Sequence, residues 1–151
     1  MVCEIRLARE MDAEAISNVI IAALRETNAK DYPSEIINRV VDNFSPAAVR
    51  EFLGFRMVFV AVEGATIVGT ASLDGTVVRA VFVSPSEQKQ GIGSKLMAEI
   101  ESAARANGIV VLSVPSSVTA QPFYAKLGFE AVEDSYYGNE RTIIMKRSLR
   151  P

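Results

Sequence analysis

The amino-acid sequence predicts an α/β domain whose mixed central sheet is flanked by helices. Segments with the two-residue period of strands alternate along the chain with segments that have the 3.6-residue period of helices. Three strand-like segments follow one another with short turns in the middle of the chain, which indicates antiparallel neighbours. The expected order is β-α-α-β-β-β-α-β-α-β-β, with a short third helix before the middle strands. The 151 residues contain no repeat or linker, so we expect one domain over 1–151.

Capping residues and hairpin dipeptides predict the elements of the first half. Asp12 is expected to cap a first helix, Ser34 a second, and Ser45, followed by Pro46, a third. Asp74-Gly75 is the strongest hairpin dipeptide in the chain and should join the last two of the middle strands. The predicted segments are a strand over 3–9, helices over 12–30, over 35–44 and from 45 onward, and strands over 56–63, 66–73 and 76–83.

The second half alternates helices with strands. A helix is expected to end at about Ala106, with Leu96, Ile100, Ala103 and Ala104 on its apolar face. The almost continuously apolar "IVVLSV" is typical of a strand buried on both faces. The remaining segments are that strand over 109–114, a short helix capped by Thr119 and ended by Gly128, and a closing strand pair over 129–134 and 141–149 around "SYYGNE".

The absence of histidine removes several classes of enzyme. Ser-His-Asp and Cys-His hydrolases and histidine-ligated metal sites all need imidazole, so we expect no metal site. Acid–base chemistry would have to come from carboxylates, tyrosine, lysine, the backbone or water. The net charge of −2 and the lack of a basic run argue against a nucleic-acid partner.

The cysteine count, the N-terminal residues and the length of the apolar runs predict where in the cell the protein is found. The chain has a single cysteine, Cys3, and no signal-peptide pattern precedes the charges at Glu4 and Arg6. Apolar runs fall far short of the roughly 20 residues that span a bilayer. We therefore expect a cytoplasmic protein with no membrane partner.

A glycine-rich segment, "SPSEQKQGIGSK" at 84–95, stands between a predicted strand and a predicted helix. It is not a P-loop, because Gly93 is followed by Ser94 and Lys95 in the wrong order, and it is not a Rossmann turn, because Leu96 stands where a small residue is needed. Backbone N–H groups at a helix N-terminus still favour an anion such as a pyrophosphate, and glycines allow its close approach. An ordinary glycine-rich βα turn is the alternative.

The stretch "VFVSPSEQKQGIGSKLMAEIE", 81–101, resembles the acetyl-CoA signature of the GNAT N-acetyltransferase superfamily, [RQ]-x-x-G-x-[GA]. Gln88, Gly91 and Gly93 occupy the three defined positions. The "V-x-P" at 83–85 and "FYAKLGF" at 123–129 are separate matches, and the predicted order of elements is the order in this family. The resemblance implies a GNAT-like acyl-CoA N-acyltransferase fold with acetyl-CoA as co-substrate.

The resemblance also implies which residues bind CoA. The backbone of the glycine-rich loop would hold the pyrophosphate, and a backbone N–H near Val81 or Phe82 would polarise the thioester carbonyl. Ser117 stands where the family often has an asparagine that contacts pantetheine, and Lys126 where members sometimes reach the 3′-phosphate. The expected cofactor-binding residues are Val81, Phe82, Val83, Gln88, Lys89, Gln90, Gly91, Ile92, Gly93, Ser94, Ser117 and Lys126.

Tyr124 matches the tyrosine that family members place near the CoA sulfur as a general acid. A phenol with a pKa of about 10 is a reasonable proton source for a thiolate with a pKa of about 8.5. A buried core tyrosine is the alternative. The segment 111–113 lacks the glutamate base of the superfamily's protein N-terminal acetyltransferases, so the base stays open between water, Asp74 and Glu63.

The acceptor site is predicted less sharply than the cofactor site. By strand alternation Arg79 should share a face with Val81 and Val83, where it would favour a carboxylate-bearing acceptor or pair with a structural acid. By the resemblance, further acceptor residues come from the helix joint and the C-terminal hairpin; the candidates are Asp31, Tyr32, Glu35, Tyr136 and Tyr137.

Together these patterns predict direct acetyl transfer from acetyl-CoA to the primary amine of a small molecule, with Tyr124 as general acid. Three alternatives stay open: acetylation of a protein N-terminus or lysine, a non-catalytic acyl-CoA-binding domain, and a nucleotide-binding domain. A homodimer is a common arrangement in the superfamily.

Overall fold

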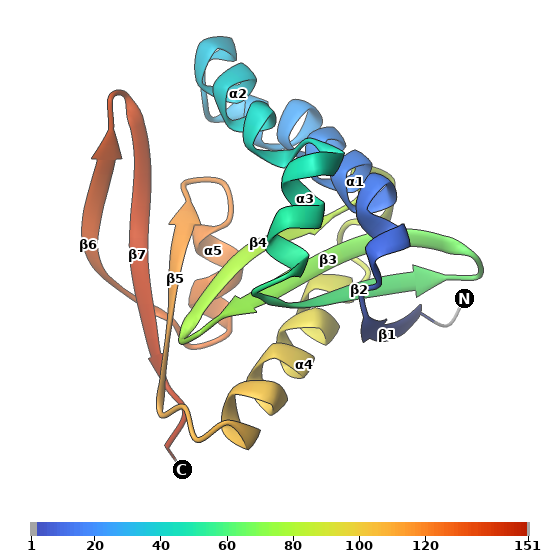
Figure 1. Ribbon diagram of the computed structural model, residues 1–151. Helices are drawn as coiled ribbons and strands as arrows, with labels where there is room; N and C mark the ends of the chain where they lie inside the picture. The colour runs from blue at the N-terminus through green and yellow to red at the C-terminus, as the bar shows by residue number, and fades with distance from the viewer. Residues whose placement is uncertain (1–2, 151) are drawn as a thin grey trace.

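The computed structural model of the protein describes residues 3–150 and contains one seven-stranded sheet (Figure 1). The strands are β1 (Cys3–Leu7), β2 (Met57–Glu63), β3 (Thr66–Asp74), β4 (Val77–Val83), β5 (Val111–Ser117), β6 (Glu130–Tyr137) and β7 (Glu140–Ser148). The helices are α1 (Ala13–Glu26), α2 (Ser34–Val41), α3 (Pro46–Leu53), α4 (Ile92–Ala106) and α5 (Gln121–Lys126), with short 3-10 turns between some of them.

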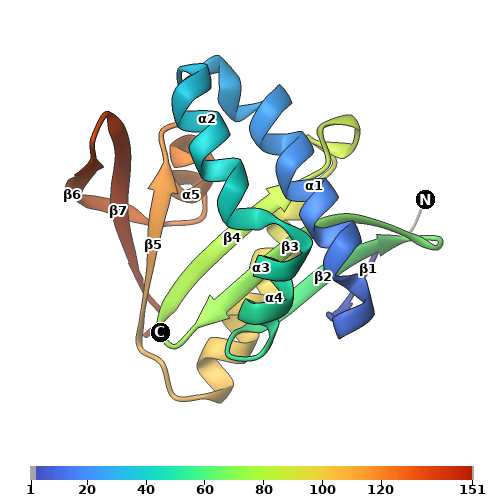
Figure 2. The same ribbon diagram turned by 45° about the horizontal axis from the view of Figure 1, so that its top comes forward.

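The sheet consists of two antiparallel parts. Its order is β1-β2-β3-β4-β5-β7-β6, and only β4 and β5 run parallel. These two strands are paired at a single position, Val77 with Ser113, close to where each begins. Beyond that pair they diverge, so the sheet opens into a V between β4 and β5 (Figures 1 and 2).

A β-bulge lies in β4 beside this opening. Ser72 is paired with Arg79 and Thr70 with Phe82, so two residues of β4, Ala80 and Val81, stand opposite the single residue between Thr70 and Ser72. Ala80 has a φ of 52°, which is uncommon for a residue other than glycine. A bulge bends its strand and increases the local twist, which favours the departure of β4 from β5.

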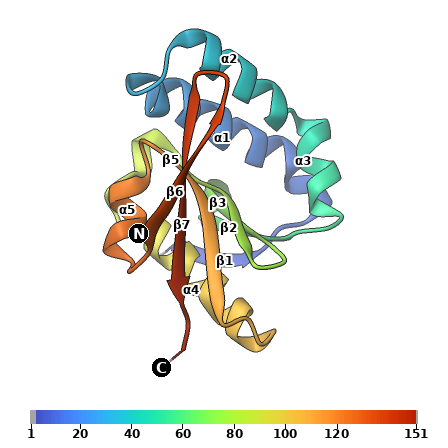
Figure 3. The same ribbon diagram turned by 90° about the vertical axis from the view of Figure 1, so that its left-hand side faces the viewer.

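Helices lie on both sides of the sheet (Figure 3), and an apolar cluster of buried side chains fills each side. On one side α4 and α5 pack through buried residues that include Leu96, Ile100 and Tyr124. On the other side α1, α2 and α3 pack through Ile16, Ile20 and other residues of the second cluster. The predicted apolar face of α4 is confirmed, since Leu96, Ile100 and Ala104 are buried.

The predicted α/β architecture and the order of its elements are confirmed, but several predicted caps are wrong. Ser45 does cap α3, because its Oγ accepts from the Ala48 N–H at 3.2 Å. Asp12 occupies the predicted N-cap position of α1 but makes no side-chain cap bond, because its carboxylate accepts from the N–H of Arg9 and pairs with Arg6. Ser34 is the first residue of α2 and makes no cap, since Pro33 occupies the capping position.

The start of α5 also differs from the prediction. Thr119 is not its cap, because the Thr119 hydroxyl donates to Asp31. Ser117 accepts from the Ala120 N–H at 3.1 Å and fixes the turn before the helix. The capping role therefore passes to a serine three residues before the N-cap.

The predictions for the last three strands, β5, β6 and β7, need correction. β5 runs over 111–117, and its burial alternates, so it is not buried on both faces. The reason is that α1 packs over β3 and β4, while β5 lies beyond the opening of the sheet. β6 and β7 extend through most of the expected loop, and only Gly138 and Asn139 separate them.

Within residues 3–150, no helix is long and apolar enough to cross a membrane, and no cluster of His, Cys, Asp or Glu could hold a metal ion.

Candidate active site

A cleft of about 890 Å³ lies where β4 and β5 diverge. Its walls come from β4, β5, the glycine-rich loop, the first turns of α4 and α5, and the joint between α1 and α2. Of the predicted cofactor residues, all except Gln90 line this cleft; these are Val81, Phe82, Val83, Gln88, Lys89, Gly91, Ile92, Gly93, Ser94, Ser117 and Lys126. The structure thus brings together residues that are up to 45 positions apart in the sequence (126 − 81 = 45).

The side chain of Gln88 holds the glycine-rich loop in place. Its amide donates to the Val83 carbonyl at 3.1 Å and to the Thr27 hydroxyl at 3.2 Å. The loop is therefore tied both to the end of β4 and to the end of α1. Because the Gln88 side-chain amide bonds to protein groups, Gln88 positions the loop through its side chain.

The backbone of the loop turns so that α4 begins at the wall of the cleft. Gly91 precedes α4 with a φ of 80°, in the left-handed region that glycine adopts without steric cost. Lys89 also has a positive φ, 66°. The first N–H groups of an α-helix have no partner within the helix, so this turn offers donors to an anion in the cleft.

Gly93, which lines the cleft, also has a packing role. A Cβ at this position would lie 3.0 Å from Phe123 Cε1 and 3.1 Å from Phe123 Cζ. The missing side chain therefore lets the start of α5 pack closely against the start of α4. This contact brings the two signature motifs, "QGIG" and "FYAKLGF", side by side.

Tyr124 lies on α5 with only 4% of its surface exposed, yet it reaches the wall of the cleft. Phe123 and Phe129 pack edge-on against its ring, at centroid distances of 5.1 and 5.6 Å. Burial raises the pKa of the phenol well above its ordinary value, so Tyr124 stays protonated over the whole neutral range. Its hydroxyl makes no hydrogen bond with any residue in 3–150, which leaves the proton free for a ligand.

Arg79 lies on the other face of β4 from the one predicted. Val81 and Val83 pack against the α4 side of the sheet, whereas Arg79 pairs with Ser72 and reaches Asp74. Simple alternation fails here because the bulge at Ala80 inserts one extra residue. Arg79 still lines the cleft, from the side of α1–α3.

Arg56 is a cleft residue that the sequence did not indicate. It follows α3 and precedes β2, and its guanidinium stacks 4.4 Å from the centre of the Phe52 ring. Both Arg56 and Arg79 approach Asp74, at 4.0 and 3.3 Å. Nothing in the local pattern around Arg56 distinguishes it from a surface arginine before a strand.

The predicted acceptor residues are only partly brought to the cleft. Tyr32 lines it, but its hydroxyl accepts from the Val118 N–H at 2.7 Å and donates to the Arg141 carbonyl at 2.9 Å. Glu35 and Tyr136 are exposed and do not line the cleft. Glu140, which was not predicted, does line it and pairs with Arg39 at 3.0 Å.

The arrangement fits a CoA molecule. Free N–H groups at the start of α4, with Lys89 and Lys126, suit its phosphates, and the gap between β4 and β5 suits an extended arm. Neither Asp74 nor Glu63 lines the cleft, whose acidic residues are Glu87 and Glu140. Two features define an acyl-CoA N-acyltransferase fold. The sheet is split between two parallel strands, and a glycine-rich turn begins a helix at this split.

The comparisons with known proteins give the family. A sequence model of the acetyltransferase (GNAT) domain matches residues 28–147, and the chain belongs to this family. No curated protein sequence matches the chain. The protein is therefore an acetyltransferase of the GNAT type.

Solved structures share the fold over the whole chain. A GCN5-related N-acetyltransferase from Rhodopseudomonas palustris is 25% identical, with a TM-score of 0.91 and 98% of each chain covered. The PaiA N-acetyltransferase from Thermoplasma acidophilum, in complex with coenzyme A, is 22% identical, with a TM-score of 0.84 and 98% and 99% coverage. YncA from Salmonella typhimurium, solved with its cofactor acetyl-CoA, is 24% identical, with a TM-score of 0.67 and 99% and 95% coverage.

Proposed function

We propose that the protein transfers the acetyl group of acetyl-CoA to the primary amine of a small molecule. The observation that carries the proposal is the position of Tyr124, at the wall of the β4–β5 cleft and next to the start of α4. The solved relatives bound to coenzyme A and acetyl-CoA share this fold, which supports the same ligand for this cleft.

Acetyl-CoA supplies a thioester, whose acetyl carbon is open to attack by an amine. In the reaction the amine nitrogen bonds to that carbon, the C–S bond breaks, and the proton lost by the nitrogen ends on the sulfur. We propose that the N–H groups from Gly91 to Ser94 bind the pyrophosphate and that Gln88 positions them. Backbone N–H near the bulge, at Val81 or Phe82, would stabilise the developing oxyanion.

Tyr124 would act on the leaving sulfur. Its buried phenol has a raised pKa and an unused hydroxyl, so it is protonated when the C–S bond breaks. A positioned proton donor typically accelerates a reaction by about 10²–10⁴-fold, and because the raised pKa makes this phenol a weaker acid, we expect the low end of that range. The neutral amine attacks, and the proton that its nitrogen loses after bonding to the acetyl carbon replaces the one that the phenol gives up, so the residue returns to its starting state.

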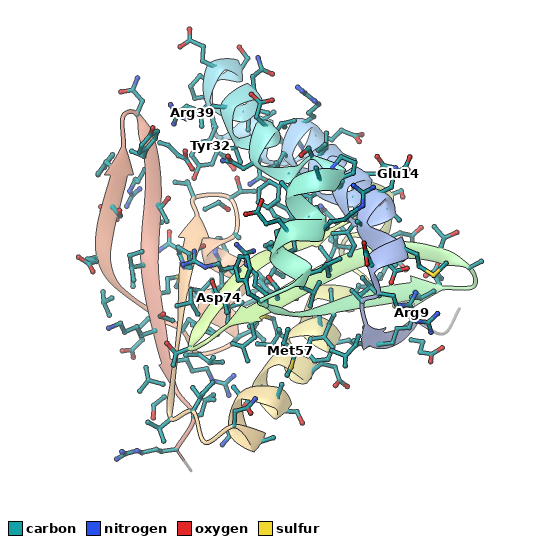
Figure 4. The ribbon with its side chains drawn as sticks, in the orientation of Figure 1. Arg9, Glu14, Tyr32, Arg39, Met57 and Asp74 are labelled. Atoms are coloured by element: carbon teal, nitrogen blue, oxygen red, sulfur yellow. The ribbon has the colours of Figure 1, made fainter. Side chains whose placement is uncertain are left out.

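Contacts between the α1–α2 region and the β6–β7 hairpin, on the acceptor side of the cleft, favour a small acceptor. Arg39 on α2 binds the hairpin of β6 and β7, at Glu140 (3.0 Å) and at the Tyr137 carbonyl (3.3 Å). Tyr32 adds its bond to Arg141, and both side chains lie beside the hairpin in Figure 4. These contacts form a bridge across the acceptor side that narrows the path for a protein segment.

Release of CoA thiol in the presence of acetyl-CoA and a panel of amines tests the proposal. Small primary amines should release CoA faster than water does and should gain one acetyl group. CoA binding without release for any amine would instead support a non-catalytic acyl-CoA-binding domain. Acetylation of peptide N-termini or lysines, with no small amine accepted, would support a protein acetyltransferase.

A further inference from the structure

Two arginines meet at the narrow end of the cleft, beside the single pair that joins β4 to β5. Arg56 and Arg79 both line the cleft, and they share one carboxylate, that of Asp74. Within residues 3–150, the charged groups that act on Arg56 are Arg79 and Asp74. This corner therefore carries two positive charges and one negative charge, a net charge of about +1. Figure 4 shows Asp74 where the two strands come together.

The guanidinium groups have donors that the protein leaves unused. Arg79 makes one hydrogen bond, from Nε to Asp74 at 3.3 Å. Arg56 makes no hydrogen bond with residues 3–150. Its Nε is buried without a partner and lies 4.0 Å from an oxygen of Asp74, too far for a hydrogen bond. A buried cation without hydrogen-bond partners is costly, and an anion that accepts those bonds removes much of the cost.

Arg56 is also held in a fixed position. Its side chain is only 17% exposed, and it stacks on Phe52 at 4.4 Å and on Phe55 at 5.6 Å. Burial, and then the charge of Arg79, lower its pKa from the usual value, yet an arginine remains charged at neutral pH. A rigid guanidinium with a planar fork of free N–H groups matches the two oxygens of a carboxylate.

We propose that Arg56 and Arg79 bind a carboxylate of the acceptor, so that the preferred substrates are small amines that also carry a carboxylate. This inference rests on acetyl transfer to a small amine, as proposed above. The anion belongs to the acceptor because the pair lies on the α1–α3 side of β4, away from Lys89 and the start of α4. Arg79 and Val81 are two residues apart on either side of the bulge, so their Cα atoms are separated by at most about 7 Å, which a small amino acid can span.

Matched acceptors test this proposal directly. Amino acids of increasing chain length are compared with their own carboxamides, which keep the amine and the size but lose the charge. The wild-type protein should acetylate the best acid with a kcat/KM about 10–100-fold above that of its carboxamide, as expected for charge-assisted hydrogen bonds. Equal rates for acid and carboxamide would overturn the proposal and leave acetyl transfer intact.

Variants locate the effect. Arg79→Gln should raise KM for the acid more than for the carboxamide and reduce the preference for the acid to about threefold or less. Arg56→Gln should act in the same direction, and Arg79→Gln, whose side chain is 41% exposed in the wild type, covers the case in which the Arg56 variant does not fold. Arg50→Gln, an exposed arginine on α3, is the control and should keep the full preference.

A preference for the acid that survives in folded Arg79→Gln would overturn the assignment to this pair. Release of no CoA with either member of any matched pair would overturn the acceptor proposal, whereas acetyl transfer itself is overturned only if the wider amine panel also releases no CoA.

Discussion

The ring of Tyr124 is enclosed by Phe123 and Phe129, while its hydroxyl faces the cleft. Phe123 in turn fills the space left by Gly93, so the position of the phenol depends on the glycine-rich motif. The ring is buried, but the hydroxyl is not among the buried polar atoms of residues 3–150 that lack a hydrogen-bond partner, which agrees with its place at the wall of the cleft. This setting supports a role in chemistry, and it has consequences for both turnover and stability.

Replacing Tyr124 by Phe should lower kcat about 10²-fold with little change in the Kd for CoA. The ring and its packing remain, and only the proton donor is lost. Steady-state kinetics and calorimetric titration with CoA measure the two quantities. An unchanged kcat would remove the general-acid role from Tyr124.

The same variant should be more resistant to alkali. The pKa of Tyr124 is raised in the folded state, so its contribution to stability is fully present below pH 10 and is lost as the pH rises toward the folded value. Above pH 10, wild-type stability should fall about 1.4 kcal/mol per pH unit more steeply than that of Tyr124→Phe. Urea unfolding at several pH values measures this difference, and parallel curves would contradict it.

At the scale of elements, the close approach of α4 and α5 joins the two motifs that identify the family. Gly93 makes this approach possible, because its missing Cβ is where the ring of Phe123 lies. At the other end of the fold, Asp12 connects β1 to α1 through Arg6 at 2.8 Å and through the Arg9 N–H at 2.8 Å. Each contact suggests a substitution that disturbs one pair of elements.

Gly93→Ala should separate the two helix starts and weaken CoA binding. A Cβ at 3.0 Å from the ring overpacks the contact, which typically costs about 1–3 kcal/mol and exceeds the gain in helix propensity of about 1 kcal/mol. The measurements are thermal unfolding and the Kd for CoA. Glu99→Ala, on the exposed side of α4, is the control and should leave both values unchanged. A Gly93→Ala protein with wild-type stability and affinity would contradict this account.

Asp12→Asn should lower the free energy of unfolding at pH 7 by about 1–3 kcal/mol, because it removes a buried carboxylate that accepts two hydrogen bonds from Arg6. Arg6 holds the pKa of Asp12 below its usual range. The stabilisation is therefore present above pH 4 and is lost as the pH falls through the lower, folded value, so the two proteins should converge in acid. Exposed Glu14→Gln is the control, and a difference that persists at pH 2 would contradict the prediction.

At the scale of the whole molecule, two antiparallel parts of one sheet meet at a single backbone pair, Val77 with Ser113. The V beyond that pair is the binding cleft, so the same feature that weakens the sheet creates the site. The bridge from Arg39 and Tyr32 to the hairpin of β6 and β7 supplies a second connection between the two parts.

We predict that the chain unfolds as one unit, as expected of a single domain. The cluster beneath α4 includes residues from both parts of the sheet, among them Leu73, Leu112 and Met145. Unfolding followed by tyrosine fluorescence and by far-ultraviolet circular dichroism should give coincident curves, with a midpoint that CoA raises. Two separated transitions would show that the parts on either side of β4 and β5 fold independently.

The sequence by itself determined the order of the elements, the glycine-rich loop and the family resemblance. Periodicity, turn residues and short motifs are local properties, and each can be recognised within a window of about ten residues. For the same reason many of the residues that line the cleft could be predicted, since Gln88, Lys89, Gly91 to Ser94 and Tyr124 belong to two short motifs. Their alignment at one cleft then follows from the fold.

Only the tertiary structure decided the face of Arg79, the part played by Arg56 and the use of the Tyr32 hydroxyl. One extra residue at Ala80 reverses the alternation of β4, and no local pattern announces such a bulge. Arg56 lies in the turn after α3 and reaches the end of β3, where its Nε is 4.0 Å from an oxygen of Asp74, a contact between residues distant in the sequence. The acceptor side of the site is built from long-range contacts of this kind, whereas most of the predicted cofactor residues lie in one continuous segment, from β4 through the glycine-rich loop to the start of α4.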